Sequence, residues 1–213
     1  AALRVAHYTV CGQVISHCSF VGSVRTLRRV FMSDEVQLIK VIDSHTAGEP
    51  TRVVIDGLPK ADLAGPVAWR DFLRDQHDWL RTAVACEPRG HEAMVGAYLV
   101  EPTQSDCVAG VVFFNNVGYL HGCLHGTIGV TVTLAHLGRL KEGENKIETP
   151  TGVVTVRSPQ EGWVSVQNVR SWRHAADVPV EVPGWGTVHG DVAWGGNWFY
   201  LIEAGDTIKV DFG

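Results

Sequence analysis

The residue with the clearest chemical potential is Cys123, which lies between glycines and histidines in residues 115–129, at the head of an apolar run. A thiol becomes more acidic where backbone N–H groups and the positive end of a helix dipole point at it. A glycine-flanked turn that opens a helix supplies both. The sequence therefore predicts a reactive thiolate at Cys123.

The other cysteines suggest no second site. The chain has five cysteines with no CxxC pair and no regular spacing, which argues against a disulfide framework or a structural zinc site. Cys86 and Cys107 lie in apolar runs, where buried, inert thiols are expected. This cysteine usage fits a reducing compartment, and we expect the protein to be cytoplasmic.

Composition sets wider limits on what the protein does. The chain has 213 residues, of which 45% are hydrophobic and 19% charged, as expected for one large globular domain or two small ones. A net charge of -5 argues against a nucleic-acid surface. No stretch approaches the roughly 18 apolar residues of a membrane span, so we expect no membrane association.

Residues 1–31 differ from the rest of the sequence. They contain neither Asp nor Glu, and polar residues interrupt their apolar positions without a sustained period. We expect the native start at Met32 and a non-native or disordered leader over residues 1–31, translated from upstream sequence or added artificially. A transit peptide is the alternative, but this segment would form a poor amphipathic face.

The remaining pattern predicts an α+β fold with two helices. One helix is expected over residues 62–84 with Pro66 in its first turn, while residues 127–138 fit a strand and a helix equally well. Alternating β-type runs predict the strands. These strands are expected at residues 36–42, 53–55, 94–100, 107–114, 147–149, 153–156 and 163–166, in a Pro/Gly-punctuated stretch through residues 178–180, and in one final strand over residues 192–202.

Several conspicuous residues have mainly structural interpretations. His45, Glu49 and Arg52 lie in a polar turn over residues 43–52, where turn chemistry explains the sequence and a role in shaping a cleft stays open. Asn115 and Asn116 are expected to hydrogen-bond the loop that aims Cys123. The aromatic residues of segment 194–200 are expected to form core.

Five segments in order resemble the proline racemase family, and within it the 4-hydroxyproline epimerase branch. The similarity runs from about Met32 to the end of the chain. The segments are VIDSHTAGEPTR at residues 41–52, EPRGH at 87–91, the Cys123 segment at 115–129, IETP at 147–150 and GDVAWGGNWF at 190–199.

The resemblance implies a diaminopimelate-epimerase-like fold with two similar lobes, each a sheet wrapped around a central helix. On that basis we expect a first lobe over residues 32–185 that carries Cys123. Residues 186–213 are expected to begin a second, truncated lobe. The substrate would bind in the cleft between the lobes.

The resemblance also implies a mechanism. Inverting a Cα centre requires acid/base groups on opposite faces, and in this family two cysteines supply them without metal, pyridoxal or nicotinamide. Cys123 would be one of the two, and the backbone amides of Leu124 and His125 would bind the substrate carboxylate. The expected substrate is 4-hydroxyproline or a similar imino acid, and a homodimer is a further expectation.

Two departures from the family pattern stand out. Leu124 occupies the position of a glycine in the family's Met-Cys-Gly-His wording, and the segment that carries the family's second cysteine does not occur. We therefore expect no appreciable epimerase activity from this chain alone. The alternatives are half of a trans-3-hydroxyproline dehydratase or of a proline racemase, and an inactive fragment or pseudogene product.

Overall fold

The computed structural model describes residues 3–9, 37–157, 159 and 162–203. Along the chain these divide into two compact units, with the boundary between Asn168 and Val169. The first unit contains three helices and most of the strands. Its helices are α1 (Gly65–Gln76), α2 (Trp79–Ala85) and α3 (Leu124–His136). Its strands are β1 (Leu3–Thr9), β2 (Gln37–Thr46), β3 (Glu49–Asp56), β4 (Val95–Val100), β5 (Cys107–Asn115), β6 (Tyr119–Leu120), β7 (Glu144–Thr149), β8 (Gly152–Arg157) and β9 (Val166–Gln167).

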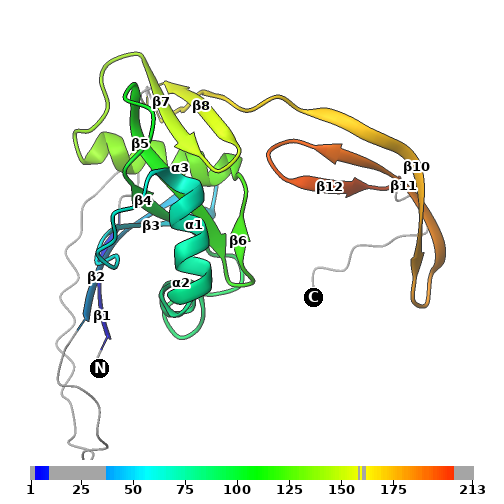
Figure 1. Ribbon diagram of the computed structural model, residues 1–213, viewed down its shortest axis with the longest axis horizontal. Helices are drawn as coiled ribbons and strands as arrows, with labels where there is room; N and C mark the ends of the chain where they lie inside the picture. The colour runs from blue at the N-terminus through cyan, green and yellow to red at the C-terminus, as the bar shows by residue number, and fades with distance from the viewer. Residues whose placement is uncertain (1–2, 10–36, 158, 160–161, 204–213) are drawn as a thin grey trace, which may run out of the picture. The chain divides into compact units, whose positions relative to one another are not determined.

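The strands of the first unit form one mixed sheet in the order β1-β2-β3-β4-β5-β7-β8-β9, with β6 paired to the end of β5 (Figure 1). The pairs β1–β2, β3–β4 and β5–β7 are parallel, and the remaining neighbours are antiparallel. The predicted α+β class is therefore confirmed. The polar turn predicted over residues 43–52 lies in a β2–β3 hairpin, which turns at Ala47 and Gly48.

The two faces of this sheet bury different helices. Consecutive strand residues point to opposite faces. On β5, Phe113 packs against Gly126 of α3, while Phe114 joins Trp69, Leu73 and Leu80 of α1 and α2 in one buried cluster. Thus α3 covers one face and the α1–α2 pair covers the other, and each helix can contribute a buried apolar stripe.

The helix predicted over residues 62–84 is interrupted in the structure. Pro66 lies in the first turn, as predicted, but α1 starts only at Gly65 and ends at Gln76, and α2 begins at Trp79. His77 between them has φ −137° and ψ 27°, outside the helical region. Arg81 of α2 donates to the carbonyls of Asn115 and Asn116, so a contact distant in sequence fixes the direction of α2.

The second unit, residues 169–213, contains strands alone within its described part. β10 (Trp172–Val182), β11 (Gly186–Trp194) and β12 (Trp198–Leu201) form an antiparallel three-stranded sheet. The predicted boundary between residues 185 and 186 falls in the turn that joins β10 to β11. The assignment of residues 32–185 and 186–213 to lobes of a longer protein stays a prediction.

The prediction that the aromatic cluster of the second unit forms core is wrong. Trp198 and Phe199 are 52% and 49% exposed, although the rings of Trp194 and Trp198 touch at a centroid distance of 5.1 Å. The physical reason is that residues 169–203 form a single layer. Neither face of that sheet is covered by another element of the same described unit.

Part of the predicted leader is structured. β1 lies within residues 1–31 and pairs in parallel with β2, from Leu3 opposite Gln37 to Thr9 opposite Asp43. Residues 10–31, with Cys11 and Cys18, lie outside the described residues, as does Met32. In the part of the chain that is described, no helix has the length and apolarity needed to cross a membrane.

Candidate active site

Cys123 is the N-cap residue of α3. Its backbone is extended (φ −150°, ψ 116°), and its Sγ accepts a hydrogen bond of 3.3 Å from the backbone N–H of Gly126. Its carbonyl accepts from the N–H and the hydroxyl of Thr127, at 2.9 and 2.7 Å. The ambiguous segment after Cys123 is therefore helical, and the sulfur takes the place of the oxygen that usually caps a helix.

Two glycines bring the start of α3 close to the sheet. A Cβ atom on Gly126 would lie 2.9 Å from the Phe113 ring and 3.1 Å from the Cys123 sulfur. A Cβ atom on Gly129 would lie 2.6 Å from Cβ of Thr51 on β3. Because a real Cβ atom cannot approach so closely, these positions require glycine for packing, and this packing fixes where Cys123 lies over the sheet.

We expect Gly129→Ala to lower the free energy of unfolding by about 1–2 kcal/mol. Helix propensity alone would favour alanine by about 1 kcal/mol. The overlap with the stiff, buried Thr51 side chain opposes this, since overpacking a core costs about 1–3 kcal/mol and more where the neighbour cannot move. Urea unfolding measures the sign of the change in the free energy of unfolding. Gly118→Ala is the control, because a Cβ there would meet no heavy atom within 4 Å. A stabilised Gly129→Ala protein would contradict this account of α3 packing.

The environment of the Cys123 thiol opposes the predicted gain in acidity. Burial raises the pKa of the thiol above its ordinary value, and the backbone N–H groups of Gly126 and His125 lower it by less. The carboxylate of Glu49 raises the pKa further. The net effect is to raise the pKa of the Cys123 thiol, so the protonated thiol is the resting form at neutral pH.

The rate of alkylation tests whether folding raises the pKa of the Cys123 thiol. We expect the pH midpoint for alkylation of Cys123 by iodoacetamide to lie higher in the folded chain than in the urea-unfolded chain, because only the thiolate reacts. Peptide mass spectrometry separates Cys123 from the other cysteines. By linkage, a pKa raised in the folded state gives stability at low pH that is lost as the pH rises through that value. An equal or lower midpoint in the folded chain would show that the N–H groups outweigh burial.

The two residues after Cys123 have different surroundings. Leu124 is 52% exposed, so its side chain stands at the surface in front of the helix N-terminus. His125 is half-buried, and its Nδ1 lies 3.7 Å from the Cys123 sulfur. The carbonyl of His125 accepts from the Thr46 hydroxyl at 3.4 Å, which ties α3 to the β2–β3 hairpin. Thr46 was not singled out from the sequence, although its place in the polar turn was the available signal.

The loop that leads to Cys123 is held by Asn115, as predicted. Its side-chain oxygen accepts from the backbone N–H groups of Val117 and Gly118, both at 2.9 Å. Nothing in the sequence pointed to Arg81, whose guanidinium donates to the loop carbonyls of Asn115 and Asn116 and pairs with Asp78 at 2.7 Å. A buried arginine of this kind is recognised only when the chain is folded around it.

Arg52 is a structural residue in this arrangement. It is 5% exposed, forms a two-pronged pair with Asp43 at 2.8 Å on each side, and donates to the carbonyls of Val84 and Arg89. It thus joins the hairpin to the turn after α2. His45 lies at the turn itself, where its Nδ1 accepts from the N–H of Gly48 at 3.3 Å.

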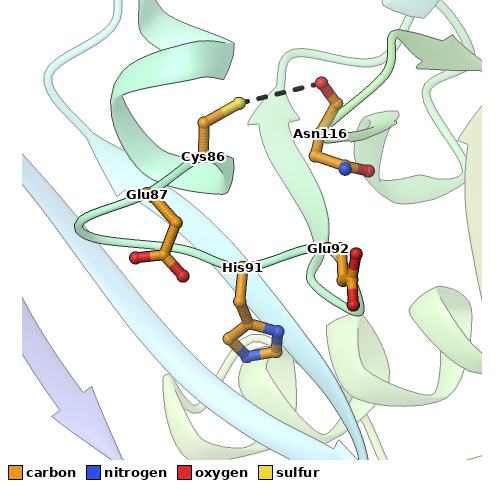
Figure 2. A pocket seen from close by; sticks show the side chains of 5 residues that line it. All are labelled: Cys86, Glu87, His91, Glu92 and Asn116. Atoms are coloured by element: carbon orange, nitrogen blue, oxygen red, sulfur yellow. Dashed lines mark hydrogen bonds between the residues drawn. The ribbon is translucent and has the colours of Figure 1, made fainter. Parts of the chain in front are cut away.

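A separate cavity of about 330 Å³ lies beside the turn after α2, lined by Cys86, Glu87, His91, Glu92 and Asn116 (Figure 2). The Cys86 sulfur lies 3.7 Å from the Asn116 carbonyl oxygen.

The prediction of a buried Cys86 is wrong, because this side chain is half-exposed at the end of α2. Cys107 is buried, as predicted, and is a free thiol like Cys86 and Cys123. Cys123 does not line this cavity.

Comparisons with known proteins by sequence and by structure agree on one family. The sequence model of the proline racemase family matches residues 41–211. The 4-hydroxyproline 2-epimerase of Chromohalobacter salexigens is 53% identical over 174 residues, covering 81% of this chain and 56% of the relative. The 4-hydroxyproline 2-epimerase of Xanthomonas campestris pv. campestris is 56% identical over 165 residues, covering 78% and 53%. The chain thus spans about half the length of these curated relatives.

Two solved structures share the fold. A hydroxyproline epimerase from Agrobacterium vitis, with bound trans-4-hydroxy-L-proline, matches with a TM-score of 0.71 at 24% identity. A probable proline racemase from Agrobacterium radiobacter, with bound carbonate, matches with a TM-score of 0.72 at 26% identity. Each match covers 78% of this chain and 52% of the solved one.

Proposed function

The chain belongs to the proline racemase family, and we propose that it carries one of the two acid/base groups of a 4-hydroxyproline epimerase. The observation that supports this is the position of Cys123, a thiol at the N-terminus of α3 with backbone N–H groups directed at its sulfur. Relatives about half identical to this chain are 4-hydroxyproline 2-epimerases by name. The reaction is inversion at the α-carbon of 4-hydroxyproline.

The proposed step moves one proton on one face of the substrate. In one direction the Cys123 thiol gives its proton to the planar Cα carbanion, forming the Cα–H bond and leaving a thiolate. In the other direction the thiolate removes the α-proton and the electron pair stays on the substrate. The raised pKa of Cys123 supports the protonated resting form, which suits the first direction.

The carboxylate of the substrate would bind at the N-terminus of α3. The backbone N–H groups of Leu124 and His125 lie in its first turn, where a helix has N–H groups without partners in the preceding turn. Charge that moves onto the carboxylate in the carbanion would be stabilised there. The exposed side chain of Leu124 stands at the same place, so we expect Leu124→Gly to tighten substrate binding.

Inversion needs a second acid/base on the opposite face. We propose a second cysteine for this role, as in the two-cysteine mechanism of the family, from sequence that the relatives have and this chain does not span. An unpaired thiol can exchange a proton on its own face but cannot protonate the other. We therefore expect the chain alone to give no appreciable conversion of trans-4-hydroxy-L-proline.

A chimera tests the proposal. Residues 41–211 of this chain would replace the matching segment of the Xanthomonas campestris relative, and chiral chromatography would follow trans-4-hydroxy-L-proline and its cis-D epimer. We expect conversion by the chimera and none by the chain alone. A folded chimera without activity, both as built and with Leu124→Gly, would reject the proposal. Conversion by the chain alone would reject the need for a second group outside it.

A further inference from the structure

Three buried polar atoms belong to α3 and to the β2–β3 hairpin that packs against it. They are Oγ of Ser44, Oγ1 of Thr51 and Nε2 of His125, and none has a hydrogen-bond partner among the described residues. Ser44 is 7% exposed and Thr51 is fully buried. A buried polar atom without a partner is destabilising by about 1–3 kcal/mol, so such groups in native proteins usually bond an ordered water.

The geometry brings the three residues to one side of α3. Ser44 and Thr51 are directly opposite each other in the antiparallel register of β2 and β3, so their side chains share a sheet face. Thr51 packs against Gly129, where a Cβ would lie 2.7 Å from its hydroxyl oxygen. His125 precedes Gly129 by one helical turn and so lies on the same face of α3. The Thr46 bond to the His125 carbonyl holds the hairpin against this turn.

The other ring nitrogen of His125 faces the candidate catalytic thiol. Nδ1 lies 3.7 Å from the Cys123 sulfur, within the range of a sulfur hydrogen bond. A neutral imidazole has one N–H and one acceptor nitrogen. The partner of Nε2 therefore decides whether Nδ1 accepts from the thiol or donates to it.

We propose that Ser44 and Thr51 are positioning residues that hold His125 in the Nε2-protonated form through one ordered water. The water accepts the Nε2–H and donates to the two hydroxyl oxygens, which meets the two to four polar contacts a buried water needs. Nδ1 is then left without a proton and accepts from the Cys123 thiol. The importance of this tautomer for turnover rests on the proposed function of Cys123.

The tautomer can be measured without any turnover. Two-bond ¹H–¹⁵N correlation spectra of the ¹⁵N-histidine-labelled chain distinguish Nε2-protonated from Nδ1-protonated rings. A pH series identifies the spectra of the neutral ring, in which one ring nitrogen carries a proton and the other does not. His125→Gln identifies the His125 signals among the ten histidines. We expect the Nε2-protonated pattern in the unchanged chain.

Variants separate this role from a structural one. Thr51→Val keeps the shape of the side chain, and with Ser44→Ala it should shift His125 to a mixture of the two tautomers. Thr51→Ser, which keeps the hydroxyl, should retain the original pattern. Thr133→Val is the matched control. Like Thr51, Thr133 is buried and its hydroxyl has no hydrogen-bond partner in the described part of the chain, but Thr133 lies on α3 about two turns after His125.

Three results would overturn the proposal. They are an Nδ1-protonated His125 in the unchanged chain, an unchanged His125 pattern in both Thr51→Val and the double variant, and an equal shift in Thr133→Val. If the double variant does not fold, Thr51→Val alone gives the same readout, because it exchanges one hydroxyl for a methyl group. A folded chimera that is inactive both as built and with Leu124→Gly, but shows the expected tautomer, would reject the proposed function and leave the positioning role standing.

Discussion

Replacing Cys123 by serine in the chimera is expected to lower the rate of 4-hydroxyproline epimerisation by about 10²–10⁴-fold, the usual contribution of one general acid/base. Serine has nearly the same shape, so α3 and its N-cap should be preserved. Its hydroxyl is far less acidic than the thiol and cannot form the anion that removes an α-proton. Initial rates from chiral chromatography, in both directions, provide the measurement.

Other thiols supply the control for this prediction. Cys86 lines the separate cavity beside the turn after α2, and Cys107 is buried in β5. We expect Cys86→Ser and Cys107→Ala to retain most of the activity of a folded chimera. Full activity in the Cys123→Ser chimera would exclude Cys123 as the acid/base. An equal loss in Cys86→Ser would place the reacting thiol in the cavity of Figure 2.

Asp43→Ala is expected to lower the free energy of unfolding by about 3 kcal/mol, near the lower end of the range for breaking a buried ion pair. The Arg52 side chain is 6% exposed, whereas Asp43 keeps 23% exposure, which favours the lower end. Without Asp43 two hydrogen bonds of the guanidinium are lost and its charge stays buried. Arg52 also holds the carbonyls of Val84 and Arg89, so the turn after α2 should loosen as well.

The same hairpin contains a matched control. Lys40 and Asp56 are also opposite each other on β2 and β3 and pair at 2.8 Å, but their side chains are 42% and 60% exposed. Exposed pairs contribute about 0–1 kcal/mol because water and salt screen them. Urea unfolding of Asp43→Ala and Asp56→Ala should therefore differ severalfold. Equal effects would mean that the Arg52 pair is not protected from solvent as the structure indicates.

The local pattern of the sequence was sufficient for most strands and for the position of Cys123 at a glycine-flanked turn. The nearly continuous apolar runs of β4 and β5 reflect burial on both faces of the sheet, and such runs can be read directly from the sequence. Pro66 marked the first turn of α1, although not its first residue, because the backbone preference of proline acts within one turn. The proline racemase resemblance rests on residues that are contiguous in the chain.

The state of residues 127–138 was decided by packing. Their β-branched residues favour a strand locally, but as a helix they place Gly126 and Gly129 against Phe113 and Thr51 and bury Val130 and Leu134. Tertiary contact of this kind routinely outweighs a local propensity of a few tenths of a kcal/mol per residue. The orientation of α2 depends likewise on the hydrogen bonds from Arg81 to the distant loop of Asn115.

The chemical environment of Cys123 was also beyond the sequence. Local reasoning found the helix dipole and the N–H groups, which act over a few residues and lower the thiol pKa. Burial by the hairpin and the nearby Glu49 act through space and raise it, and the second effect is the larger. Sequence by itself singled out Cys123 as the candidate for the chemistry and predicted most of the elements around it. The tertiary structure alone decided the direction in which the pKa of Cys123 shifts and the arrangement of Ser44, Thr51 and His125, because solvent exclusion and contacts between distant segments exist only in the folded chain.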